Sequence, residues 1–196
     1  MGLPLTKSDS RFTYADYRLW PETERWELID GIAWNMCAAP SRAHQELSGE
    51  LHLLLRSWLK GKPCRVYDAP FDVLLPANPD ESDDEVDTVV QPDLVVYCDR
   101  TKLTDAGARG APDLVVEIIS PWTIKKDLND KFRLYERVGV KEYWVLDPAG
   151  SVQAYTLGAK GRYGDPVILV GGGTLSCAVL EGFTVDMAAL FAEAKD

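Results

Sequence analysis

The sequence predicts an α/β domain in which helices pack against a mixed β-sheet. Two observations support this class. An amphipathic helical segment precedes a run of short apolar strands that are separated by Pro, Gly and Asp, and a second amphipathic segment with a further strand follows the two most apolar strands. This order of elements is typical of a mixed sheet that carries helices against it.

The length and the composition fit a single domain. The chain has 196 residues, of which 46% are hydrophobic and 27% are charged, and a chain of this size can bury a large core. We expect one domain over 1–196, with its core at about 24–187. We find no run of the ~20 apolar residues that a membrane span needs and no signal-peptide core at the N-terminus, so we expect a cytoplasmic protein.

The N-terminal part is expected to hold a hairpin and a long helix. FTYADYRLW (12–20) suits a short helix, and ERWELIDGIAWNM (24–36) suits two strands around an Asp30-Gly31 turn. Ser41 is a suitable N-cap for a helix over 42–60 that ends at Gly61. Helical spacing predicts its apolar face as Ala43, Leu47, Leu51, Leu54, Leu55 and Trp58.

The rest of the chain is expected to alternate strands with two helices. Two short strands stop at prolines, and the acidic stretch that follows them is too polar for a core and suits an exposed loop. In chain order we predict strands at 64–70 and 71–76, a loop at 77–87, strands at 89–98 and 112–120, a helix over 123–138, a strand at 142–148, weaker strands near 151–157, 162–170 and 174–179, and a short helix at 186–194.

The charge and the cysteines exclude some classes of function. A formal net charge of -10 argues against broad electrostatic adhesion to nucleic acid. Six of the acids lie within PDESDDEVD (79–87), so this charge does not exclude a basic patch elsewhere on the surface. We find no CxxC pair, which argues against zinc and redox motifs. We therefore expect four reduced thiols, at Cys37, Cys64, Cys98 and Cys177.

The stretch PDLVVEIIS (112–120) places one carboxylate inside a very apolar strand. A period of two puts Glu117 on the same face as Asp113, with Leu114, Val116 and Ile118 on the other face. A buried ionised carboxylate is disfavoured unless a cation or several donors meet it. Glu117 is therefore either a site residue or a core carboxylate that is paired with one base.

A second carboxylate lies at the start of the preceding strand. If the two strands are neighbours, Asp93 and Glu117 converge, and two such carboxylates take up a proton or a cation. Carboxylate oxygens together with water suit Mg²⁺ or Mn²⁺. Asp113 stands at the edge of its strand, where it either shapes the strand start or adds to the site.

The predicted helix over 123–138 carries a lysine within its apolar arc. At 100° per residue, Lys131 falls near the centre of an arc made by Ile124, Leu128, Phe132, Leu134, Tyr135 and Val138. A buried lysine needs an anion within reach, and both Glu117 and Asp127, one turn earlier, are candidates. The alternatives are a lysine stem that reaches solvent and a purely structural pair with Asp127.

The helix over 42–60 offers two further candidates. His44 lies on its apolar side, as a core or capping histidine or as a site residue, and Glu50 at the edge of the same arc could lend a carboxylate. His52 is expected to face outward.

Taken together, these motifs resemble those of the Uma-two family of restriction endonucleases, within the PD-(D/E)XK nuclease superfamily. The matching stretches are PD (92–93), PDLVVEIISPWT (112–123), DxxxK (127–131) and GVKEYWVLDP (139–148), and the resemblance covers about 26–187. It implies a restriction-endonuclease-like fold, with a central mixed β-sheet flanked by helices, an N-terminal β-hairpin and additional C-terminal strands.

The resemblance also implies a catalytic site. By the pattern of the superfamily, Asp93 and Glu117 hold a divalent metal, and the backbone carbonyl of Ile118 or Ile119 can complete the shell. The lysine that the superfamily places two residues after Glu117 is replaced here by Ile119. In this family the lysine comes from the following helix, and Lys131 matches that place.

The expected function is Mg²⁺-dependent (or Mn²⁺-dependent) hydrolysis of DNA phosphodiester bonds, and a homodimer would suit cleavage of both strands. The alternative is a nuclease-like fold that binds nucleic acid or a protein without cutting. A carboxylate glycosidase is a weaker third hypothesis, because the sequence offers no aromatic platform for a sugar: Tyr143 and Trp144 suit core positions of a strand.

Overall fold

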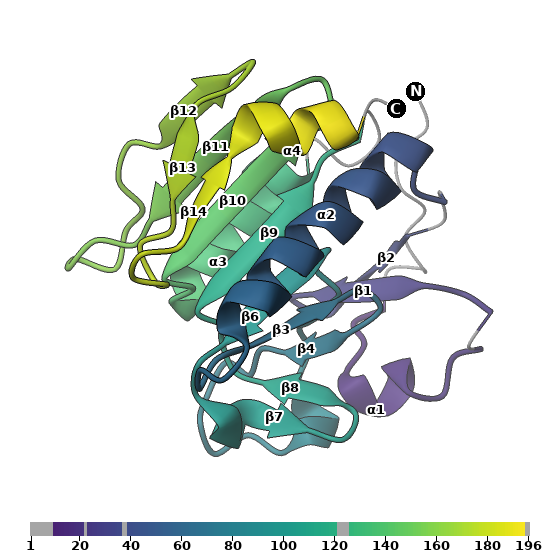
Figure 1. Cartoon of the computed structure of the whole chain (residues 1–196). Helices are drawn as coiled ribbons and strands as arrows, with labels where there is room; N and C mark the ends of the chain where they lie inside the picture. Colours follow the sequence, from purple (N-terminus) through teal and green to yellow (C-terminus); the bar gives the residue numbers. More distant parts are fainter. Residues whose placement is uncertain (1–9, 22, 37–38, 121–125, 195–196) are drawn as a thin grey trace.

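The structure is a computed structural model that describes residues 10–21, 23–36, 39–120 and 126–194. The predicted α/β class is confirmed: a six-stranded mixed sheet lies between helices (Figure 1). Its strand order is β12-β11-β10-β9-β6-β3, and only β9 and β10 pair in parallel. The strands are β3 (Arg65–Asp68), β6 (Leu94–Tyr97), β9 (Leu114–Ile118), β10 (Glu142–Asp147), β11 (Ser151–Thr156) and β12 (Val167–Val170).

A second six-stranded sheet, which the sequence did not predict as a separate unit, is built around the N-terminal hairpin. Its order is β2-β1-β5-β4-β8-β7, and β13 and β14 form a two-stranded sheet. The strands are β1 (Trp26–Ile29), β2 (Ile32–Asn35), β4 (Asp72–Leu74), β5 (Val89–Val90), β7 (Leu103–Thr104), β8 (Gly107–Arg109), β13 (Thr174–Ser176) and β14 (Thr184–Asp186).

The segment 89–98, predicted as one strand, is divided between the two sheets. Val89–Val90 forms β5 in the second sheet, whereas Leu94–Tyr97 forms β6 in the main sheet. Pro92 lies between them and has no N–H to donate to a ladder, so the strand is interrupted there. This break leaves Asp93 directly in front of β6.

The predicted hairpin turn and the long helix are confirmed. Asp30 and Gly31 both have positive φ, 51° and 76°, as a tight hairpin turn requires. The helix α2 covers Arg42–Leu59, and the Ser41 side chain accepts a hydrogen bond from the His44 N–H. One position of its predicted apolar face is wrong: Leu54 is 41% exposed, whereas Leu59, five residues later, is buried.

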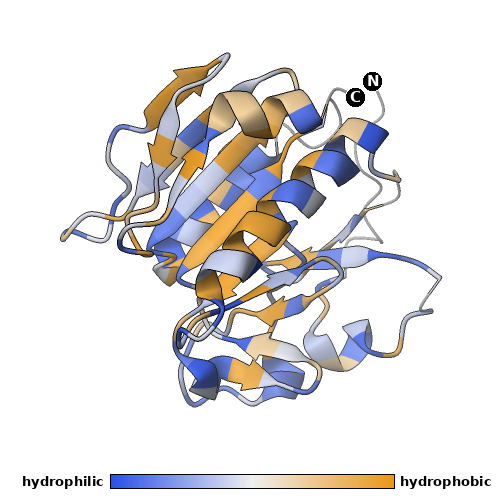
Figure 2. Ribbon diagram, viewed as in Figure 1, coloured by the Kyte–Doolittle hydropathy of each residue, from blue (hydrophilic) through white to orange (hydrophobic). Residues whose placement is uncertain are grey.

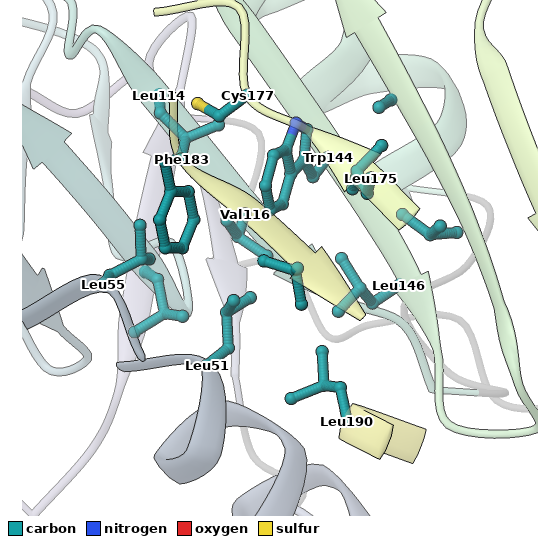
Figure 3. Close-up of a cluster of buried hydrophobic side chains, with 14 of the residues drawn as sticks. Leu51, Leu55, Leu114, Val116, Trp144, Leu146, Leu175, Cys177, Phe183 and Leu190 are labelled. Carbon is teal, nitrogen blue, oxygen red and sulfur yellow. The ribbon is translucent and has the colours of Figure 1, made fainter. Parts of the chain in front are cut away.

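Two hydrophobic clusters cover the two faces of the main sheet. On one face, α2 and α4 (Met187–Glu193) pack against β9 and β10, with Leu51, Leu55 and Leu190 above Val116 and Trp144 (Figures 1 and 3). The cluster on this face includes Leu114, Val116 and Ile118, whereas Val115 and Ile119 belong to the cluster on the other face. The period of two predicted for this strand is therefore confirmed.

The opposite face is covered by the helix α3 (Phe132–Val138), which contributes Leu134 and Tyr135 to the second cluster. A π-helical turn over Lys126–Lys131 precedes α3, and the helix ends at Gly139. Residues 123–125 of the predicted helix, with Ile124, lie outside the described residues. Figure 2 shows hydrophobic residues along the central strands and hydrophilic residues over many of the loops.

Several short elements were not predicted: β7, β8, β14 and the 3-10 turns Asp83–Glu85 and Arg100–Lys102. The short N-terminal helix is present as α1 (Tyr14–Tyr17). The acidic loop at 77–87 is largely exposed, as predicted, although Val86 is buried.

The expectation of four reduced thiols is wrong for one pair, because Cys64 and Cys98 form a disulfide. The antiparallel pairing of β3 and β6 matches Arg65 with Tyr97, so the next position outward places the two cysteines opposite each other. Cys177 is a buried free thiol, and Cys37 lies outside the described residues. Among the described helices, none has the length and apolarity to cross a membrane.

Candidate active site

The two carboxylates predicted to converge lie across from each other on paired strands. β6 and β9 are antiparallel, and Leu94 pairs with Val116, so one further step places Asp93 opposite Glu117. Side chains at directly opposite positions lie on the same face of a sheet. Asp93 Oδ2 accepts a hydrogen bond of 2.7 Å from the Ile118 N–H, which fixes the carboxylate against β9.

Glu117 is buried in the middle of the main sheet, with 4% of its surface exposed. Its Oε1 atom accepts hydrogen bonds from Lys131 Nζ and from the Tyr135 hydroxyl, each at 2.7 Å. The predicted contact between Glu117 and Lys131 is therefore present. Both donors come from the turn and helix after β9, so this segment places the base against the strand carboxylate.

Lys131 is the centre of a larger buried charge cluster. Its Nζ atom lies 2.7 Å from Glu117 Oε1, 2.9 Å from Glu27 Oε1 and 3.9 Å from Asp127 Oδ1. The lysine is 3% exposed and Asp127 is also buried. The alternative in which the lysine stem reaches solvent is therefore wrong, and both predicted anions lie within reach.

Glu27 is the member of this cluster that the sequence analysis missed. It is fully buried on β1, and its Oε1 atom also accepts a hydrogen bond of 2.9 Å from the Gln91 N–H. The available signal was the same as for Glu117, since WELI (26–29) is an apolar strand with one carboxylate. Nothing local in the sequence places β1 beside the turn that carries Lys131.

The π-helical turn gives the lysine its direction. Lys131 is the last residue of this turn and the residue before α3. The Tyr143 hydroxyl on β10 donates to the Asp127 carbonyl at 3.0 Å, which attaches the turn to the main sheet. π-helical turns occur frequently at functional sites.

Among the described residues of this cluster, three carboxylates contact the Lys131 amine, and burial together with these charges shifts the pKa values of Glu117 and Lys131. Burial raises the pKa of Glu117 to about 8 against the opposing effect of Lys131, and Asp127, Asp93 and Glu27 add to the rise. Burial alone would lower the pKa of Lys131, but Glu117, Glu27 and Asp127 together raise it well above its usual value. The lysine is therefore a permanent cation at neutral pH, and Glu117 readily holds a proton.

An open pocket begins at Asp93 and runs along α2. His44 Nε2 lies 3.0 Å from Asp93 Oδ1, and both residues line the pocket. The remaining lining residues are Arg25, Pro40, Gln45, Ser48, Gly49, His52, Asp68 and Ala69. Asp93 thus joins two environments: it is close enough to influence Glu117 in the buried cluster, and it forms part of the wall of the pocket.

His52, Glu50 and Asp113 lie outside the buried cluster around Lys131. His52 was expected to face outward, but its side chain is only 19% exposed and its Nδ1 atom lies 3.1 Å from Asp68 Oδ1. Glu50 lies on α2 away from the lining of this pocket. Asp113 contacts Lys141 Nζ and the Cys98 N–H, both at 2.7 Å, which suits its structural interpretation as a residue of the strand start.

Asp93 and Glu117 provide carboxylate oxygens, which are ligands that suit a divalent cation such as Mg²⁺. Within the described part of the chain, no group of three or more His, Cys, Asp or Glu side chains is arranged to hold a metal ion. Mg²⁺, however, is usually held by one or two carboxylates, with water and substrate phosphate completing the shell. A carboxylate has about four lone-pair directions, so the hydrogen bonds to Asp93 and Glu117 leave room for such a ligand.

Comparison with known proteins gives three similarities. The model of the Uma2 family, described as "Putative restriction endonuclease", matches residues 14–188. A protein of Synechocystis sp. that is described as uncharacterized is 28% identical over 140 residues, which are 70% of this chain and 69% of that protein. A crystal structure from Anabaena variabilis, described as "a putative nuclease belonging to DUF820", has a TM-score of 0.73 at 16% identity and covers 93% of this chain and 99% of its own. At that identity the structural match shows the fold alone.

Proposed function

The chain belongs to the Uma2 family, and from this premise we propose that it hydrolyses DNA phosphodiester bonds with the help of Mg²⁺ or Mn²⁺. One observation carries the proposal. Asp93, Glu117 and Lys131 come from three separate segments, and the fold brings Asp93 and Glu117 to facing strand positions with the Lys131 amine 2.7 Å from Glu117. Each was predicted as a site residue from the sequence.

In this proposal the carboxylates of Asp93 and Glu117 would hold the metal, and the Ile118 backbone carbonyl would be the third protein ligand. When bound, the metal polarises the phosphate and lowers the pKa of the attacking water. Asp93 is oriented by the Ile118 N–H and by His44. The Lys131 ammonium stabilises negative charge that develops on the phosphate, while Glu27 and Asp127 hold the lysine in place.

The imbalance of charge supports a cation at this position. Among the described residues, Lys131 Nζ contacts Glu27, Glu117 and Asp127, and burial together with the neighbouring carboxylates raises the pKa of Glu117 to about 8. A divalent cation held by Asp93 and Glu117 would relieve the same repulsion that a proton otherwise relieves. We therefore expect metal binding to release a proton from Glu117.

The direct test is cleavage of supercoiled plasmid DNA in Mg²⁺ or Mn²⁺ by the purified protein and by Asp93→Asn and Glu117→Gln. We expect each substitution to reduce the cleavage rate at least a hundredfold, roughly the effect of removing one preorganised catalytic group. Asp84→Asn is the matched control, because Asp84 is exposed and pairs with Arg18. Cleavage that is unchanged in both site variants contradicts the assignment.

Metal binding has a readout that is independent of cleavage. Calorimetry with Mn²⁺ should give a binding isotherm for the unmodified protein and for Asp84→Asn, and a clearly weakened one for Asp93→Asn. Absence of heat up to near-millimolar Mn²⁺ in the unmodified protein would reject the metal site. A homodimer, which suits cleavage of two strands, and a cytoplasmic location are part of the same proposal.

A second candidate function is a nuclease-like fold that binds nucleic acid or a protein without cutting. The depth of the cluster favours it, because Lys131 and Glu117 are 3% and 4% exposed and are already paired with each other. If this function is correct, DNA binding persists in the Asp93→Asn variant, and neither the variant nor the unmodified protein cleaves plasmid in Mg²⁺ or Mn²⁺.

A further inference from the structure

The pocket beside Asp93 extends along α2 well beyond the proposed catalytic residues. Its helix side is made by residues that are one and two turns apart, namely His44, Ser48 and His52. With a rise of about 1.5 Å per residue, the eight positions from His44 to His52 span about 12 Å. The pocket therefore has room for more than the single phosphate group at which hydrolysis would take place.

Gly49 lines this pocket in the interior of α2. Glycine weakens a helix interior relative to alanine, so its presence needs a reason. A Cβ atom added here would meet nothing within 4 Å, and the residue is exposed. Packing inside the chain therefore does not require glycine at this position, whereas a ligand that lies close to the helix backbone would.

The far end of the pocket contains an oriented histidine. Asp68 contacts Nδ1 of His52 at 3.1 Å, so Nε2 is the ring nitrogen that a ligand can reach. This arrangement repeats the pairing of His44 with Asp93 at the near end. A carboxylate that fixes one ring nitrogen sets the direction of the other, so His52 presents a defined polar group to the pocket.

Arg25 supplies a cation on another wall of the pocket. Its guanidinium donates to Gln91 Oε1 through Nε at 3.3 Å and through Nη2 at 3.0 Å, and Gln91 in turn donates to Asp72 Oδ1 at 2.8 Å. The arginine is thus held by a neutral acceptor, and its charge remains available to an anion. In a chain with a net charge of -10, the pocket brings together one arginine and two histidines, and Asp93 and Asp68 lie against those histidines.

We propose that this pocket is the track of the substrate strand: a single phosphodiester strand lies along α2 from Asp93 to His52. Gly49 provides clearance for the sugar-phosphate backbone. Arg25, Ser48 and His52 contact the phosphates next to the one that lies at Asp93. This inference rests on the proposed function only for the direction of the strand, because Asp93 marks the end at which hydrolysis takes place.

The test measures binding without chemistry. Fluorescence anisotropy of a labelled 12-nucleotide single strand, as DNA and as RNA, is recorded in EDTA for the unmodified protein, Gly49→Leu, His52→Ala and Ser57→Leu. We expect Gly49→Leu and His52→Ala to bind roughly tenfold more weakly, about the loss of one hydrogen bond to a charged group. Ser57→Leu places the same side chain on an exposed position of α2 away from the pocket and should bind as the unmodified protein does.

The melting temperature of Gly49→Leu shows whether a loss of strand binding comes from a blocked pocket or from misfolding of the variant. Leucine has a higher helix propensity than glycine, so Gly49→Leu should melt at the same temperature as the unmodified protein or higher while it loses affinity. Equal affinity of Gly49→Leu and the unmodified protein overturns the track, and so does the absence of strand binding by the unmodified protein. Loss of binding in Gly49→Leu without cleavage by any variant supports the track and rejects the hydrolysis. Cleavage by the unmodified protein together with unchanged binding by Gly49→Leu supports the hydrolysis and rejects the track.

Discussion

The buried cluster around Lys131 and the open pocket along α2 are built from the same kind of part, a carboxylate paired with a base, yet they differ in nearly every physical respect. In the cluster, one lysine serves three carboxylates at 3% exposure. In the pocket, each histidine pairs with one aspartate, and the Asp68 side chain is 59% exposed. Burial therefore makes the first arrangement costly to disturb and leaves the second free to exchange partners.

The difference in burial suits the buried cluster and the pocket to different roles, and Asp93 borders both regions. A deeply buried charge network is rigid and holds its members in one geometry, which suits the groups that would act on a reacting phosphate. At the far end of the pocket the Asp68 side chain is 59% exposed, and contacts of exposed side chains cost little to rearrange, which suits contacts that form and break with a bound strand. Asp93 belongs to both regions, since it is opposite Glu117 on the sheet and is bonded to His44 in the pocket.

The largest expected effect is the loss of the buried cation. Lys131→Met removes the ammonium that contacts Glu27, Glu117 and Asp127, and removal of one partner from a buried charge network costs about 3–5 kcal/mol. Urea denaturation should show this loss in the free energy of unfolding. The double variant Lys131→Met/Glu117→Gln should recover part of it, and a single variant as stable as the unmodified protein would contradict the described charge pairing.

The next effect is a dependence of stability on pH that originates at Glu117. Its pKa in the folded protein is about 8 because of burial, against an ordinary value of 4.5. Between these values the folded protein holds a proton that the unfolded chain has lost. The contribution of this group is therefore fully present below about pH 4.5 and is lost as the pH rises through about 8.

The measurement is the unfolding free energy at several pH values between 5 and 8 for the unmodified protein and Glu117→Gln. The difference between the two should fall with rising pH by at most about 1.4 kcal/mol per pH unit, the value for one proton. A difference that does not change with pH would mean that Glu117 is ionised throughout this range. Mn²⁺ at saturating concentration should flatten the dependence if the metal replaces the proton.

The third effect is a smaller loss of stability on substitution of Asp93, which lies between the buried cluster and the pocket. Asp93→Asn keeps an oxygen that can accept from the Ile118 N–H, so we expect a loss of only about 1 kcal/mol in the unfolding free energy. Thermal melting with and without Mn²⁺ measures it. Strong destabilisation by Asp93→Asn would place this residue with the buried cluster and not between the two regions.

The sequence predicted much of this site because its signals were local. An apolar strand of period two that contains Glu117 and a helical segment with Lys131 in its apolar arc each identify a residue that needs a partner, and the two residues proved to be partners. The hairpin turn at Asp30-Gly31 and the N-cap at Ser41 were likewise readable from a few neighbouring residues.

The parts that were missed depend on contacts between distant segments. Glu27 reaches Lys131 across 104 positions of the chain, and the Cys64–Cys98 disulfide closes a separation of 34. The strands β5 and β6 lie on either side of Pro92 and belong to different sheets. None of these follows from periodicity or propensity, since each depends on which strands become neighbours.

The smallest expected effect lies at the far end of the pocket, where the comparison between the two regions is sharpest. The Asp68 side chain is 59% exposed and pairs with His52, and exposed ion pairs contribute about 0.2–1 kcal/mol. Asp68→Asn should therefore change the urea midpoint only slightly, whereas Lys131→Met in the buried cluster should lower it strongly. If Asp68→Asn lowered the unfolding free energy by several kcal/mol, this pair would be a structural element of the fold, and a role in exchangeable binding would be ruled out.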